Sequence, residues 1–121
     1  MEPWKSILIP PESTVMDAIK TIDSNGPLLT ALVVEQNRQL LGTVTDGDIR
    51  RGMLNYVSMD AKVTEIMNKN PITVSENASQ QEIGTILKNH PRCRVIPLLD
   101  KKARVIGIKQ DSNSFTAKFE N

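Results

Sequence analysis

The feature that most constrains this chain is that its sequence repeats itself. When the sequence is shifted by 65 positions, Ile7 falls on Ile72 and Gly42 falls on Gly107, with no gap between the two matches. The apolar stretches between these anchors coincide as well, Val33-Val34-Glu35 with Leu98-Leu99-Asp100 and Leu40-Leu41 with Val105-Ile106. Because one offset holds through turns and glycines, the chain contains two copies of one structural unit.

The patterns inside the first copy predict its elements. Residues 7–9 form a short strand, and residues 13–26 form a helix that begins at Ser13 and Thr14 and stops at Gly26. Two runs rich in β-branched and aliphatic residues follow, TALVVE and LLGTVT, joined by the polar turn QNRQ. The segment TDGDIRRGMLN predicts a second helix, so the copy reads β-α-β-β-α.

The second copy follows the same order. Residues 72–74 form its first strand, and NASQQEIGTILKNHP forms its first helix, with Ile83, Ile86 and Leu87 facing inward. RVIPLLD and RVIGI form the next two strands, joined by KKA. Pro97 lacks a backbone donor, which predicts that its strand lies at a sheet edge or at an irregular point.

The size of each copy determines how the copies combine. One copy is close to the lower limit for burying a core, so the two should pack as one domain. Continuous apolar runs such as ALVV predict sheets covered by helices. We therefore expect an α+β fold of two tandem β-α-β-β-α repeats, packed as one pseudo-twofold module. Repeat 1 spans residues 4–56, a linker with a short helix spans 57–71, and repeat 2 spans 72–121.

Composition excludes several classes of protein. The net charge of +1 and only four aromatic residues argue against nucleic acid as a partner. The longest apolar runs are too short to span a membrane, and the N-terminus MEPWKS has no signal-peptide pattern. We expect a cytoplasmic protein with no membrane partner. The single cysteine, Cys93, excludes an internal disulfide, and we expect it to be a small core residue.

The stretch GTVTDGDIRR places Thr45 and Asp48 three residues apart where a helix should begin. This spacing is a capping box, in which the hydroxyl and the carboxylate each accept a backbone N–H. A helix start is also an anion site, because its free N–H groups point outward. The same residues could therefore cap the helix, bind a nucleotide, or do both.

These repeats resemble a pair of CBS domains, the Bateman module, over nearly the whole chain. The resemblance rests on two tandem β-α-β-β-α units with a Gly-x-apolar-Thr-x-x-Asp signature after the third strand, and on the lead-in VTEIM followed by NPITV. More narrowly, WKSILI, LLGTVTDGDIRRGML and EIMNKNPITV are similar to the N-terminal CBS pairs of bacterial sugar-phosphate nucleotidyltransferases related to mannose-1-phosphate guanylyltransferase.

Such modules typically bind adenine nucleotides, with AMP, ADP and ATP as the possible ligands here and no cofactor required. The resemblance implies that Thr45 bonds phosphate or ribose and that Asp48 accepts hydrogen bonds from the ribose hydroxyls. An ionised carboxylate suits this role, because it accepts and never donates. Ile72 and Thr73 would contact the adenine.

The phosphates would be bound by arginines. The resemblance places Arg94 at a phosphate-binding position before the strand VIPLLD, and Arg50 or Arg51 could reach phosphate from the helix after Asp48. CBS modules also pair, which implies a homodimer through residues 46–56, including Ile49, Met53 and Leu54.

The second copy departs from the signature. Gln110 and Asn113 stand at the positions that correspond to Thr45 and Asp48, and the strand pattern after Gly107 gives way to KQDSNS. We therefore expect only one of the two symmetry-related clefts to bind a nucleotide. The C-terminal part of repeat 2 is expected to be degenerate or truncated.

Catalysis and metal binding find little support in the residues. The chain has no phosphate-binding or dinucleotide-binding glycine motif and no nucleophile–base pair, so we expect a non-catalytic module. Asp46, Asp48 and Asp60 lack a histidine partner, which favours a helix start over a metal site, and His90 is expected to be solvated. Two hypotheses remain: a nucleotide-sensing regulatory module, or a purely structural dimerisation module.

Overall fold

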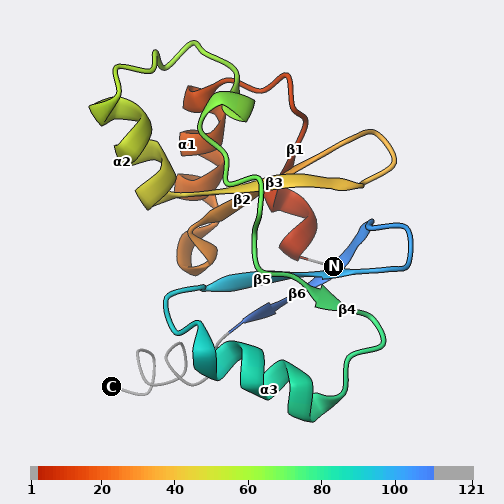
Figure 1. Ribbon diagram of the computed structural model, residues 1–121. Helices are drawn as coiled ribbons and strands as arrows, with labels where there is room; N and C mark the ends of the chain where they lie inside the picture. The colour runs from red at the N-terminus through yellow and green to blue at the C-terminus, as the bar shows by residue number, and fades with distance from the viewer. Residues whose placement is uncertain (1–2, 111–121) are drawn as a thin grey trace.

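The computed structural model describes residues 3–110, which form two similar halves (Figure 1). The first half contains, with η denoting a 3-10 helix, η1 (Pro3–Ile7), β1 (Leu8–Ile9), α1 (Val15–Ser24), η2 (Gly26–Leu28), β2 (Thr30–Val34), β3 (Leu40–Thr45) and α2 (Asp46–Leu54). The linker contains η3 (Val63–Glu65), and the second half contains β4 (Val74–Ser75), α3 (Gln80–Asn89), β5 (Val95–Leu99) and β6 (Val105–Gln110). The predicted α+β class is confirmed.

Each half builds a three-stranded sheet of the same topology. The strand orders are β1-β2-β3 and β4-β5-β6, with the first pair parallel and the second antiparallel in both. Val33 pairs with Gly42 in the first sheet, Leu98 pairs with Gly107 in the second, and a bulge follows Val33 and Leu98 alike. The offset of 65 residues in the sequence is therefore also the offset in register.

The two hairpin turns contact each other reciprocally. The Leu40 N–H donates to the Ala103 carbonyl at 3.1 Å, and the Val105 N–H donates to the Arg38 carbonyl at 2.9 Å. Arg38 and Ala103 both adopt positive φ, 70° and 63°. Leu40 and Val105 are 65 residues apart, and so are Arg38 and Ala103, so exchanging the two repeats turns each bond into the other. The halves are therefore related by a pseudo-twofold axis.

The core has two parts, one on each face of β2. Alternate side chains of a strand point to opposite faces, and all five residues of β2 are buried. Ala31 and Val33 pack under α1 and α2, whereas Leu32 and Val34 pack between the two sheets against Val95 and Val105 of the second half. The sheets thus lie in the middle, with α1 and α2 on one outer side and α3 on the other (Figure 1).

Within residues 3–110, each α-helix begins with a capping box, made by Thr14 in α1, Thr45 in α2 and Ser79 in α3. Backbone N–H donation from Thr14 lowers the pKa of Asp17, and the same donation from Ser79 lowers the pKa of Glu82.

The short strands begin later than we predicted. Ile7 is the last residue of η1, fully buried between the sheets, and β1 starts at Leu8. Ile72 and Thr73 precede β4, which pairs with β5 only from Val74 onward.

Of two further expectations about the second sheet, one holds in part and one is wrong. The strand of Pro97 is central and Pro97 is fully buried, so it is not at an edge, but an irregular point does lie beside it, between Leu98 and Leu99. Its strand pairs with β4 only from Leu98 onward, so the ladder on that side needs no N–H at position 97. The strand after Gly107 does not end there but continues to Gln110, because Ile108, Lys109 and Gln110 all pair with β5.

Helix α3 is less buried than we predicted. Ile83, Ile86 and Leu87 are only half-buried, and α3 contributes no fully buried residue. In the first half, Ile49 of α2 and Val63 of the linker join α1 in one cluster. Within residues 3–110 no second helix packs beside α3, and the segment that corresponds to α2 lies outside the described residues.

Candidate functional site

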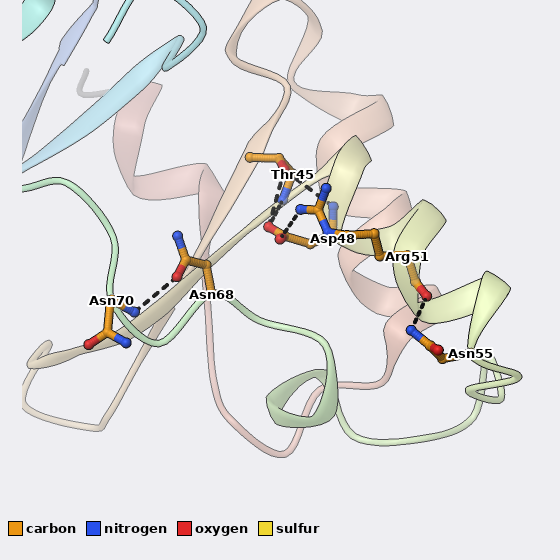
Figure 2. Close-up of polar contacts among 6 residues, drawn as sticks. All are labelled: Thr45, Asp48, Arg51, Asn55, Asn68 and Asn70. Carbon is orange, nitrogen blue, oxygen red and sulfur yellow. Dashed lines mark hydrogen bonds and ion pairs between the residues drawn. The ribbon is translucent and has the colours of Figure 1, made fainter. Parts of the chain in front are cut away.

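The site begins where β3 turns into α2, at Thr45. The Thr45 N–H donates to Asp48 Oδ2 at 2.9 Å, and the Thr45 hydroxyl donates to the same oxygen at 3.1 Å (Figure 2). The Asp48 N–H approaches the hydroxyl at 3.4 Å. The corresponding bonds in the other two capping boxes are 3.0 Å and 3.1 Å. The predicted cap is therefore present, and its N–H-to-hydroxyl bond is longer than in the other two.

Arg51 occupies the remaining oxygen of Asp48. Its Nη2 donates to Asp48 Oδ1 at 2.8 Å (Figure 2). The Asp48 side chain is 11% exposed and the Arg51 side chain 61% exposed. Both oxygens of the carboxylate are thus engaged in the protein without a ligand.

The linker forms the wall beside this helix start. Thr43 and Asn68 exchange backbone hydrogen bonds at 3.1 Å and 2.8 Å, which holds the linker against β3. A Cβ built on Gly42 would lie 2.7 Å from the Asn68 carbonyl oxygen and 2.8 Å from Met67 Sδ. Only a glycine at position 42 allows this approach. Beyond the crossing, the Asn70 N–H donates to Asn68 Oδ1 at 3.0 Å (Figure 2).

A cleft of about 480 Å³ lies between the start of α2, the linker and the segment that leads into β5. Of the predicted site residues, Thr45, Asp48, Arg50, Ile72 and Arg94 line this cleft. Thr73 does not contribute to its walls. The chain therefore brings residues from both repeats to one place.

The cleft carries an excess of positive charge. Four arginines line it, Arg50, Arg51, Arg92 and Arg94, against the two carboxylates Asp46 and Asp48. Arg51 is paired with Asp48. Among the described residues, the other three arginines form no ion pair, and their side chains are exposed. Such a surface attracts an anion, and guanidinium groups match the geometry of phosphate.

Sequence reasoning missed several residues of the cleft. Cys93, which we expected in the core, is half-buried and lines the cleft between Arg92 and Arg94. Arg92 could have been found from the sequence, since it lies two residues before Arg94, which was already predicted to bind phosphate. Asn68 had none, because its place depends on the backbone pairing with Thr43.

Other parts of the molecule give less indication of a binding site. A larger hollow of about 750 Å³ lies beside β1 and the turn after β2, and contains none of the predicted site residues. Within residues 3–110, no group of three or more His, Cys, Asp or Glu side chains could hold a metal ion. Gln110 ends β6 opposite Val95, while Asn113 lies outside the described residues.

The CBS domain family model matches this chain twice, over residues 3–55 and 63–108. The chain belongs to the CBS domain family. The two matched segments correspond to the two halves of the fold, so the protein is a tandem CBS pair. None of the described helices is both long enough and apolar enough to cross a membrane.

Curated relatives of this CBS pair are longer than the chain itself. YlbB of Bacillus subtilis is 33% identical over 95 residues, which cover 74% of this chain and 63% of YlbB. An uncharacterised protein of Helicobacter pylori strain J99 is 28% identical over 102 residues, which cover 84% of this chain. The chain spans only about 30% of the length of that relative.

Solved CBS structures share the fold. OpuCA of Staphylococcus aureus matches with a TM-score of 0.72 and 26% identity, over 94% of this chain and 92% of the other. CBSX2 in complex with AMP matches with a TM-score of 0.74 and 21% identity, over 93% and 87% of the two chains. The CBS pair of MJ0100, in complex with 5′-methylthioadenosine and S-adenosyl-L-methionine, matches with 0.72 and 22%, over 93% and 90%.

Proposed function

We propose that this CBS pair is a regulatory, non-catalytic module that binds an adenine nucleotide in the cleft between its repeats. One observation carries the proposal. The largely buried Asp48 carboxylate at a helix start and three arginines that form no ion pair with any described residue line a single cleft built from both repeats. A carboxylate accepts from a diol and guanidinium groups donate to phosphate, so the cleft offers complementary chemistry to both ends of a nucleotide's sugar phosphate.

The similar structures support the adenosine part of the proposal. CBSX2 holds AMP, and the CBS pair of MJ0100 holds two adenosine derivatives, 5′-methylthioadenosine and S-adenosyl-L-methionine. In this chain we assign the ribose hydroxyls to Asp48 and the phosphates to Arg94 and Arg50. The base would lie against Ile72, which lines the cleft.

Isothermal titration calorimetry with AMP, ADP and ATP tests this proposal. We expect at least one of them to bind, with one site per chain, because Asn113, the counterpart of Asp48, cannot supply the acceptor-only carboxylate that the second cleft would need. A ligand that binds only the folded state also raises the melting temperature. Absence of heat and of any thermal shift at millimolar nucleotide would reject the proposal, and two sites per chain would reject the asymmetry.

The attached activity is a finer proposal. Segments such as LLGTVTDGDIRRGML are similar in sequence to the CBS pairs of sugar-phosphate nucleotidyltransferases, and we therefore propose that the module regulates an enzyme of this class. The test is to assay the protein from the complete reading frame for transfer of a nucleotidyl group to a sugar phosphate, with and without adenine nucleotide. A full-length protein without this activity would remove the proposal and leave the nucleotide site untouched.

A purely structural role is the second candidate, and one observation favours it. Asp48 already accepts from the Thr45 N–H, the Thr45 hydroxyl and Arg51, so its carboxylate has hydrogen-bond partners without any ligand. In that case the module would serve only to pair two chains. Calorimetry separates the two functions, since the structural module binds no nucleotide.

A further inference from the structure

The carboxylate of Asp48 has little room for a ribose. A carboxylate offers about four acceptor positions, and three are taken: two by the N–H and hydroxyl of Thr45, and one by Arg51. A ribose diol brings two donors. One of the present donors must therefore leave before both hydroxyls can bind.

Arg51 is the donor that can leave. The Thr45 N–H bond belongs to the capping box at the start of α2 and holds Oδ2, the oxygen that the Thr45 hydroxyl also contacts. Arg51 reaches Asp48 Oδ1 with a flexible side chain that is 61% exposed. Its backbone carbonyl accepts from Asn55 at the helix end, and this bond does not depend on the side chain (Figure 2).

Gly47 provides the space in which the guanidinium lies. A Cβ built at position 47 would come within 3.2 Å of Arg51 Nη1 and 3.4 Å of Nη2. Gly47 does not have a positive φ, so the backbone does not require glycine here. Glycine in a helix is less stable than alanine. The absence of a side chain at position 47 thus makes room for Arg51 across the first turn.

The ion pair is not needed for capping. Asp17 and Glu82 make the same capping box at the starts of α1 and α3. Among the described residues, neither carboxylate has an ion pair with an arginine or lysine. The Asp48–Arg51 pair is therefore specific to the helix that lines the cleft.

We propose that Arg51 is the gate of the nucleotide site, a specificity-determining residue that selects phosphorylated ligands. In the empty cleft its guanidinium occupies Asp48 Oδ1, where a ribose hydroxyl would bind. An entering ribose displaces it. The released guanidinium then lies in the same cleft as Arg50, Arg92 and Arg94, where a phosphate can accept from it. A nucleoside has no phosphate to offset the lost ion pair, so the gate disfavours nucleosides. This inference rests on the proposed function.

The test compares adenosine with ADP on the wild-type chain, Arg51→Ala and Arg50→Ala. Both variants remove one positive charge from the cleft, but only Arg51 contacts Asp48. Arg51→Ala should bind adenosine about two- to fivefold more tightly than wild type, the range expected from loss of an exposed ion pair. It should bind ADP about tenfold more weakly, because one charged hydrogen-bond donor is missing. Arg50→Ala should not tighten adenosine binding, and melting curves check that both variants fold.

Each outcome decides between distinct conclusions. Tighter adenosine binding in Arg51→Ala alone supports the gate, including the case in which adenosine binding becomes measurable only in that variant. If wild type binds ADP but adenosine affinity is unchanged or weaker in Arg51→Ala, the gate is rejected and the nucleotide site stands. An equal gain in adenosine affinity in Arg50→Ala also rejects the gate, since the gain would then come from the lost positive charge and not from the contact with Asp48. If wild type binds neither ligand, the proposed function and the gate fail together.

Discussion

Position 42 shows how a single residue decides the shape of the cleft. The linker can cross β3 only because Gly42 has no side chain, since a Cβ there would lie 2.7 Å from the Asn68 carbonyl oxygen. Among the described residues, a Cβ built on its counterpart Gly107 would come no closer to another atom than 3.6 Å from Leu98 Cδ2, an ordinary contact. The close approach therefore requires a glycine at position 42, whereas no such approach among the described residues requires one at position 107.

We predict that Gly42→Ala lowers the free energy of unfolding by about 1–3 kcal/mol, as expected when a buried atom is forced against a packed backbone. Gly107→Ala is the matched control. It should be neutral or slightly stabilising, because alanine is favoured over glycine in a strand by roughly 0.5–1 kcal/mol. Urea unfolding of both variants measures the difference, and equal effects would contradict the close crossing.

Asp48 has a matched control in Asp17, which makes the same cap outside the cleft. If Asp48 binds ribose, Asp48→Asn should weaken nucleotide binding about ten- to a hundredfold, because hydrogen bonds to a charged group contribute roughly 1.5–3 kcal/mol each. Asp17→Asn should leave the affinity unchanged. Both variants should lose at most about 1 kcal/mol of stability, the range of a lost cap.

Titration calorimetry on the two variants checks this prediction. Equal nucleotide affinity in wild type and a folded Asp48→Asn variant would mean that the carboxylate only caps α2.

At the scale of the element, the capping boxes of α1 and α3 link helix stability to pH. Donation from the backbone of Thr14 and Ser79 holds the pKa of Asp17 and of Glu82 below its usual range. The unfolded chain therefore takes up protons at a higher pH than the folded chain. The contribution of these caps is complete above about pH 5 and is lost as the pH falls below about 4.

We expect the free energy of unfolding to decrease with acidification in this range, as measured by urea unfolding at a series of pH values. The double variant Asp17→Asn, Glu82→Gln should show a weaker dependence on pH. An unchanged slope in that variant would assign the acid sensitivity to other groups.

The sequence predicted elements best where their signals are local. The helix caps at Thr14 and Thr45 were predictable because a cap depends on residues that are neighbours in sequence. The hairpins were predictable because the repeat offset of the sequence also fixes the register of the strands. The ends of β1 and β4 were not, because pairing with the central strand sets them. The central position of the Pro97 strand was not visible for the same kind of reason: the neighbouring strand β4 is short, so no ladder bond on that side needs the N–H that Pro97 lacks.

The site residues also fall into those that local sequence predicts and those that it does not. Thr45 and Asp48 were predictable, since the chemistry of the pair lies within four residues. Cys93 was assigned to the core because a small sulfur side chain is usually buried, and nothing in its neighbourhood indicates a cleft. Asn68 reaches the cleft through a backbone crossing between distant segments. Only the folded chain reveals such a residue.

At the scale of the molecule, the surface of α2 offers a place for a second copy. Met53, Leu54 and Tyr56 are 57%, 71% and 96% exposed at and just after the end of the helix. Ile49, which we had included in the predicted contact, is only 9% exposed and packs in the core under the helices. Our proposal of a homodimer therefore now depends on the other apolar residues of this segment.

We predict that the wild-type chain scatters light as a particle of twice 13.5 kDa. The double variant Met53→Glu, Leu54→Glu should give the mass of one chain, because charges in an apolar contact oppose association. Ile106→Thr is the control, since Ile106 is an exposed apolar residue that lies on β6, outside the proposed contact. A wild-type protein that is monomeric at every accessible concentration would contradict the proposal.

The reciprocal bonds between the hairpin turns, from Leu40 to Ala103 and from Val105 to Arg38, have a consequence for the ancestry of the gene. Contacts in which two positions exchange roles are those of a twofold homodimer. A protein with a single repeat could have made both bonds between two separate chains. Gene duplication and fusion would then preserve an assembly that already existed. In the homodimer both clefts would contain the same residues, whereas in the fused chain each copy can change independently. One copy can then carry Thr45 and the other Gln110 at the corresponding position.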